Sequence, residues 1–105
     1  MATYTLTAQE IDLLHQAAIM AGDRLARQEN RIGTQVMDTL VDRLETRPLT
    51  VSLNGAQREV LGKMLMNIAY DLMRENKDAL AEAAETLAER LFQDEGGDPG
   101  STTTR

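Results

Sequence analysis

The chain has 105 residues, a formal net charge of -6 and no cysteine. This length suits one small domain and excludes large multidomain catalysis. Folding buries roughly 60–70% of the surface of a chain of this size, so nearly every apolar side chain must join the core. The lack of thiols excludes disulfides, thiolate nucleophiles and cysteine-based zinc sites. No apolar run reaches the ~18 residues of a membrane span, and the first residues do not resemble a signal peptide. We therefore expect a cytoplasmic protein.

An internal repeat organises the sequence. A shift of 47 positions aligns residues 3–44 with residues 50–91 without a gap, and nine of the 42 aligned pairs are identical. A period of this size falls in the range of helical repeat units. We predict one duplicated helical domain over residues 1–93, with repeat units 3–44 and 50–91.

Each unit begins with a short β-prone segment, over residues 3–6 and 50–53. The alternation of side chains in both segments is typical of extended chain, and the two are candidates to pair as a two-stranded ribbon. A helix start follows each segment. Thr7 with Glu10, and Asn54 with Gln57, have the capping-box spacing. The first long helix of each unit is therefore expected to begin directly after its cap, near residues 8 and 55.

Apolar residues recur every three or four positions in both long helices, which predicts one buried stripe per helix. The stripes are Ile11, Leu14, Ala18, Ala21 and Leu25 in the first unit, and Leu61, Leu65, Ile68 and Leu72 in the second.

Short breaks at residues 30–33 and 76–78 predict a reversal of the chain in each unit. The second helices are then expected over about residues 33–45 and 78–93. Their stripes are Val36, Leu40 and Leu44, and Leu80, Ala84, Leu87 and Leu91. Pro48 ends the first of these helices and the pair Gly96–Gly97 ends the second. Residues 94–105 contain nothing apolar to bury, so we predict a disordered acidic tail.

The predicted fold class is all-α. Four helices form two tandem helical-hairpin repeats, related by an approximate two-fold axis and packed at the shallow angles that helix ridges allow. Because helix-pair repeats usually form longer arrays, two units are expected to leave an apolar face for a second copy or a partner.

The third helix is apolar around most of its circumference, since ten of the fourteen residues from Val60 to Met73 are apolar or aromatic. Such a helix is either a central core helix or a contact surface. Flexible thioethers and tyrosine suit an adaptable interface, and two-fold dimers are the commonest oligomers. The residues predicted to face a protein partner or a second copy are Met64, Met66, Tyr70 and Met73.

Carboxylates form two stripes, which we call the acidic ridges: Asp38, Asp42 and Glu45 on the second helix, and Glu82, Glu85 and Glu89 on the fourth. A di-metal centre would need Glu-x-x-His pairs, which these helices lack, so solvated faces are the simpler interpretation. The ridges, through Asp38, Asp42, Glu82, Glu85 and Glu89, could also serve a partner. Imitation of DNA would require the two ridges to lie side by side.

His15 is the only histidine, and Asp12 one turn earlier could accept a hydrogen bond from it. No nucleophile or second metal ligand accompanies it at helical spacing. We therefore expect no catalytic residue, no metal and no cofactor.

Arg24, Arg27 and Arg31 gather near the end of the first helix, where cations complement the helix dipole. A nucleic-acid binder usually has a strongly basic domain, whereas this chain has a sequence pI of about 4.7. Direct reading of nucleic acid is therefore not expected.

The predicted function is a non-enzymatic protein–protein interaction module that binds stoichiometrically through its third helix and the acidic ridges, as a homodimer or with a protein partner. In its acidic, helical character the chain is similar to small accessory proteins of phages and mobile elements. The alternatives are accordingly an inhibitor of a host enzyme or defence complex, and a virion or assembly component.

Overall fold

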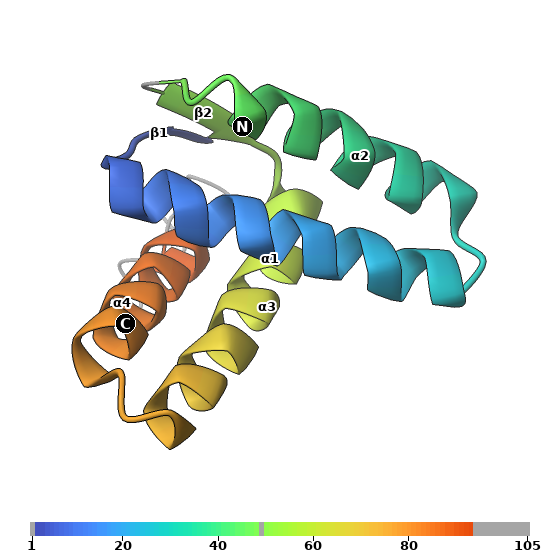
Figure 1. Cartoon of the computed structure of the whole chain (residues 1–105). Helices are drawn as coiled ribbons and strands as arrows, with labels where there is room; N and C mark the ends of the chain where they lie inside the picture. Colours follow the sequence, from blue (N-terminus) through green and yellow to red (C-terminus); the bar gives the residue numbers. More distant parts are fainter. Residues whose placement is uncertain (1, 49, 94–105) are drawn as a thin grey trace, which may run out of the picture.

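The structure, a computed structural model, describes residues 2–48 and 50–93. Its elements are strand β1 (Ala2–Thr5), helices α1 (Ala8–Arg27) and α2 (Arg31–Glu45), strand β2 (Thr50–Leu53), and helices α3 (Gly55–Arg74) and α4 (Asp78–Gln93). Each unit is a strand followed by an antiparallel helical hairpin (Figure 1). The predicted all-α class, with four helices and a small ribbon, is confirmed. The predicted acidic tail, residues 94–105, lies outside the described residues.

Capping boxes begin both long helices at the predicted positions. The Thr7 hydroxyl accepts a hydrogen bond from the Glu10 amide at 3.1 Å, and Glu10 Oε1 accepts one from the Thr7 amide at 2.8 Å. Asn54 and Gln57 make the same reciprocal pair at 2.8 and 2.9 Å. Both boxes satisfy amides at the helix start that have no partner inside the helix.

Helix α2 differs from its prediction in two ways. It begins at Arg31 rather than near Gly33, because the Asn30 side chain caps it by accepting the Gly33 amide at 2.8 Å. Its buried stripe contains Met37 in place of Val36, which is exposed. The predicted stripe was therefore wrong at its first position.

The two hairpin turns have the same backbone geometry. Glu29 and Asn76, which are equivalent in the repeat, adopt left-handed φ values of 59° and 64°. In both turns the next amide donates back to a helix carbonyl at 2.9 Å, from Asn30 to Leu25 and from Lys77 to Leu72. This pattern is that of a Schellman helix end. The structural repeat thus includes the way each helix stops.

Replacing Glu29 by glycine is expected to raise the free energy of unfolding by about 0.5–1 kcal/mol. A left-handed conformation costs a residue with a Cβ about 1–2 kcal/mol, and the greater freedom of glycine in the unfolded chain offsets part of the gain. The midpoint of thermal unfolding should rise by about 3–6 °C, measured by circular dichroism. Asn76→Gly is the matched control and should gain less, because asparagine tolerates this conformation. An equal gain at both positions would contradict the explanation.

The ribbon relates the two units by an approximate two-fold axis. Strands β1 and β2 pair antiparallel, and Tyr4 lies opposite Val51, its own equivalent 47 positions along the chain. The neighbouring pairs exchange under the same shift: Thr3 lies opposite Ser52, and Thr5 lies opposite Thr50. An axis through the Tyr4–Val51 pair therefore maps one strand onto the other.

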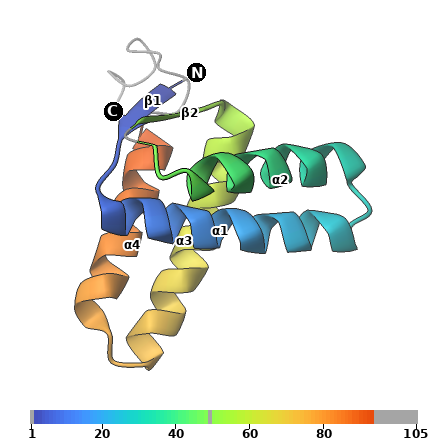
Figure 2. The same ribbon diagram turned by 45° about the horizontal axis from the view of Figure 1, so that its top comes forward.

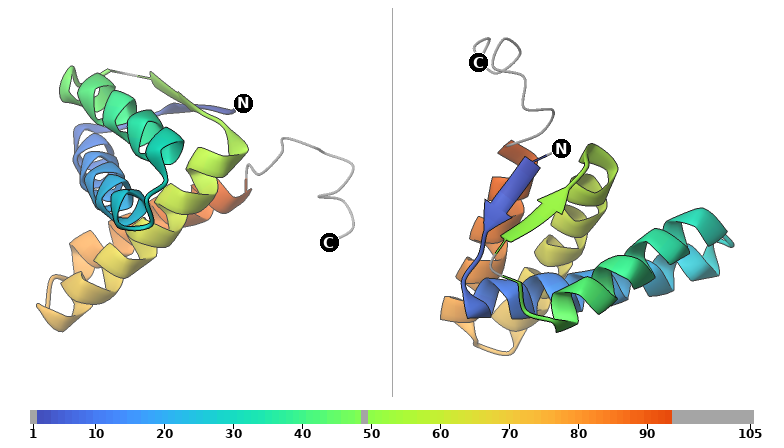
Figure 3. Two further views of the ribbon diagram at one scale, coloured as in Figure 1. Left: turned by 90° about the vertical axis from the view of Figure 1, so that its right-hand side faces the viewer. Right: turned by 90° about the horizontal axis from the view of Figure 1, so that it is seen from above.

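The two hairpins cross one another instead of lying alongside at the predicted shallow angle. Helix α1 packs across α3, and the pair α1 and α2 runs crosswise to the pair α3 and α4 (Figures 1 and 3). Ala17, Ala18 and Ala21 on the buried face of α1 are small enough to allow close approach. The largest fully buried side chains, which form the centre of the core, are Leu14, Leu44, Val51, Leu53, Leu61, Leu65, Leu87 and Leu91.

The four helices are not of the membrane-spanning kind. Within residues 2–48 and 50–93, none of them combines the length and the apolar character that crossing a bilayer requires.

Candidate interaction surfaces

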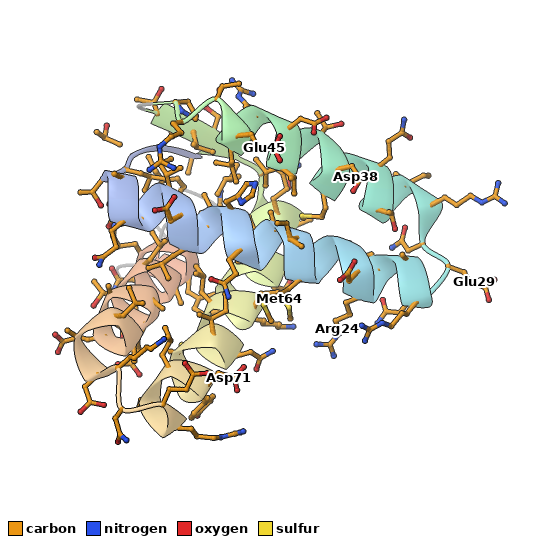
Figure 4. All side chains as sticks on the ribbon, in the orientation of Figure 1. Arg24, Glu29, Asp38, Glu45, Met64 and Asp71 are labelled. Carbon is orange, nitrogen blue, oxygen red and sulfur yellow. The ribbon has the colours of Figure 1, made fainter. Side chains whose placement is uncertain are left out.

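The structure divides the four α3 residues that the sequence assigned to a partner. Met64 is only 4% exposed and belongs to the core, and Met66 is half-buried against it. Figure 4 shows Met64 on the part of α3 next to α1. Tyr70 and Met73, by contrast, are 57% and 43% exposed at the C-terminal end of the helix. These two are the most exposed of the four, and we call them the α3 patch.

The α3 patch has no counterpart in the first unit. The equivalents of Tyr70 and Met73 on α1 are Asp23 and Ala26. Both α1 positions are exposed, as are those on α3. Folding of the hairpin therefore needs no bulky apolar side chain at these two positions.

The two acidic ridges lie far apart in the fold. Asp38 and Glu45 mark one ridge along α2 (Figure 4), and the other follows α4. Helices α2 and α4 lie on opposite sides of the crossing between the hairpins (Figures 1 and 2). The ridges are therefore not side by side, which removes the arrangement that imitation of DNA requires.

The ridge residues are mostly solvated. Asp38, Asp42, Glu82 and Glu89 are exposed, and Glu85 is half-buried. Only the α4 ridge runs on a helix that packs beside α3, the helix that carries the α3 patch.

His15 contacts Glu45, not the Asp12 carboxylate considered in the sequence. Its Nε2 lies 3.5 Å from Glu45 Oε2. Asp12 instead forms an ion pair with Arg47, whose Nη1 lies 2.7 Å from Asp12 Oδ1. Arg47 Nη2 also donates to the Ala8 carbonyl at 3.3 Å.

These side chains line a cavity of about 300 Å³ between α1 and the end of α2. The lining residues include no hydroxyl or thiol group. Over the described ranges, no cluster of three or more potential metal ligands is found.

Arg58 is a buried cation that the sequence analysis missed. It is 4% exposed near the start of α3, where Nη1 donates to the Leu53 carbonyl at 3.2 Å. Its Nε has no hydrogen-bond partner, and no carboxylate in the described part of the chain forms an ion pair with it. The internal repeat could have predicted this burial, because the residue equivalent to Arg58 in the first unit is Ile11, which belongs to the apolar stripe of α1.

A closed junction joins α4 to the first unit. Arg90 Nη1 lies 2.9 Å from Glu10 Oε2, and the Arg90 guanidinium lies over the Tyr4 ring at 5.8 Å from its centroid. Glu10 serves the capping box through its other oxygen. Tyr4 is buried and the Arg90 side chain is 37% exposed, so a carboxylate and an aromatic ring contact a half-buried cation.

The symmetry-related junction, between α2 and the second unit, is open. A groove of about 330 Å³ lies there. Its lining includes Ile32, Val36, Leu40, Arg43, Ser52 and Gln57. Helix α4 packs on α1, whereas α2 makes no comparable packing on α3. The sequence analysis did not predict this groove, which we call the α2 groove.

Comparison of the chain with protein-family models, with curated proteins and with solved structures gave no match.

Proposed function

We propose that the chain is a non-enzymatic protein–protein interaction module that acts by stoichiometric binding through the α3 patch. The observation that carries this proposal is the exposure of Tyr70 and Met73 at positions where the first unit has Asp23 and Ala26. Exposed aromatic and thioether side chains are enriched at interfaces. Because the fold does not require them, their retention on the surface is best explained by contact with another molecule.

Self-association is the form of binding that we propose first. Two-fold dimers are the commonest oligomers of a single chain, and such a contact buries the same patch on both copies. The half-buried Met66 lies on the same helix and extends the apolar surface. The acidic ridge on α4 would supply a charged rim, as is usual around an apolar interface centre.

Substitution of the α3 patch by aspartate is expected to abolish association while the fold persists. Tyr70→Asp and Met73→Asp each place a charge at the centre of the contact, where its desolvation is not compensated. Light scattering over a dilution series should show a dimer for the wild-type chain and a monomer for both variants, and circular dichroism should show unchanged helicity.

Ile19→Asp provides the matched control. Ile19 is 45% exposed on α1, close to the exposure of Met73, but it is not part of the α3 patch. It should leave the dimer intact. A wild-type chain that stays monomeric at all concentrations and has no patch-dependent protein partner would refute the proposal.

A further inference from the structure

The approximate two-fold axis gives the molecule two equivalent junctions, of which one is closed and the other is open. At the closed junction Arg90 is held by Glu10 and Tyr4. The equivalent of Arg90 is Arg43, which lines the α2 groove and is exposed. Within residues 2–48 and 50–93, no carboxylate forms an ion pair with Arg43.

Two substitutions between the units explain why Arg43 lacks the contacts of Arg90. Gln57 stands in place of Glu10: it keeps the capping box at 2.9 Å but brings no negative charge. Val51 stands in place of Tyr4, so no aromatic ring is available to lie against the guanidinium. The groove therefore lacks the two chemical groups that close the other junction.

The wall of the groove that α2 forms, on which Arg43 lies, also carries extra apolar surface. Ile32, which is 78% exposed, and Val36 occupy positions where α4 has Ala79 and Ala83. Small residues would suffice for folding, as they do in α4. Bulky ones increase the apolar area that a bound side chain could cover.

We infer that the α2 groove binds a segment of a different protein that presents a carboxylate next to an aromatic side chain. The carboxylate pairs with Arg43 as Glu10 pairs with Arg90, and the ring packs against Val36, two turns earlier on the same helix. The groove volume of about 330 Å³ lies at the lower end of the range for ligand pockets, about 300–1,000 Å³. Local charge complementarity favours an anionic group in the groove, because Arg43 lines it and forms no ion pair among the described residues.

A second copy of the chain fits less well as the occupant. The groove is formed by α2, β2 and the start of α3, and the α3 patch at the other end of α3 would be the aromatic donor. The two-fold contact proposed above already buries the α3 patch on both copies, so the patch is not free to enter a groove. A separate partner can occupy the groove without disturbing that contact.

Phenylpropionate, which joins an aromatic ring to a carboxylate, is a suitable probe for the full-length chain. Two-dimensional amide NMR spectra are recorded during titration with this probe and with neutral phenylpropionamide. Shift changes are expected at Val36, Arg43 and Ser52 with phenylpropionate. Phenylpropionamide should bind about tenfold more weakly than phenylpropionate, because it cannot form the charge-assisted hydrogen bond to Arg43.

Three variants locate the site. Arg43→Gln removes the cation and should weaken phenylpropionate binding about tenfold. Gln57→Glu places the chain's own carboxylate beside Arg43 and should weaken it similarly. Arg24→Gln, the matched control, removes an exposed cation that lines a different cavity and should leave the titration unchanged. Circular dichroism checks that each variant is folded.

The inference is overturned if the groove amides do not respond to phenylpropionate, if phenylpropionamide binds equally well, or if Arg43→Gln binds like the wild-type chain. It is also overturned if the groove amides shift with protein concentration alone, because a second copy would then be the occupant. Tyr70→Asp should leave the titration unchanged. Failure of the α3 patch and failure of the groove can therefore be told apart.

Discussion

Leu65→Asp is expected to unfold the domain. Leu65 is fully buried on α3 and belongs to the hydrophobic core. A carboxylate there would lose its hydration without gaining a partner, which costs several kcal/mol, and the apolar contacts of leucine would also be lost. The total stability of a domain of this size is only about 5–15 kcal/mol. Circular dichroism should show loss of most helical signal at 25 °C.

Asn67→Asp is the matched control for this experiment. Asn67 lies two positions further along α3 and is exposed, so the same new charge is hydrated and should change stability by less than about 0.5 kcal/mol. A Leu65→Asp chain that unfolds at the wild-type temperature would show that α1 and α3 do not form the core described above.

Arg58→Ile, by contrast, should raise the free energy of unfolding by about 1–3 kcal/mol. The variant removes a buried cation whose Nε has no partner and which forms no ion pair among the described residues. Leaving such a group unsatisfied costs about 1–3 kcal/mol, more when it is charged. Isoleucine is also the residue that the first unit uses at the equivalent position, Ile11. Urea titration with linear extrapolation measures the change.

The reciprocal substitution, Ile11→Arg, is its control. It would create a second buried cation and should destabilise the chain by several kcal/mol. If Arg58→Ile instead lowers stability, the hydrogen bond from Arg58 to the Leu53 carbonyl contributes more than the burial of the charge costs.

Local signals in the sequence predicted most of the elements. The capping boxes at Thr7 and Asn54 placed the starts of α1 and α3 correctly, because a cap depends on residues only three positions apart. The paired segments 3–6 and 50–53 form the ribbon, apart from one-residue shifts at the ends of β1.

The error at Val36 could have been avoided with the repeat itself. The α4 stripe was correctly assigned to Ala84, whose equivalent in α2 is Met37 and not Val36. Val36 and Met37 are apolar and adjacent in sequence, so periodicity within α2 alone could not decide which of them is buried. The same alignment pairs Arg58 with the buried Ile11, which a search for apolar stripes passes over because arginine is rarely buried.

Features that depend on how the helices pack together could not be predicted from local sequence patterns. The crossing of the hairpins depends on how α1 packs on α3, and periodicity predicts which face of a helix is buried but not the angle between helices. Of the candidate site, the exposure of Tyr70 and Met73 was anticipated, whereas the burial of Met64 was decided by the neighbouring helix. The α2 groove arises from residues on three separate elements and has no signature in any one of them.

The register of the ribbon has one more consequence. Because Tyr4 faces its own equivalent Val51, two identical half-chains could meet about the same axis, but any change in one half would then appear in both. Fusion into one polypeptide releases this constraint. Glutamate can remain at residue 10 while glutamine stands at residue 57, and tyrosine at residue 4 while valine stands at residue 51, so divergence at two pairs of positions can turn a symmetric scaffold into a molecule with two unlike ends.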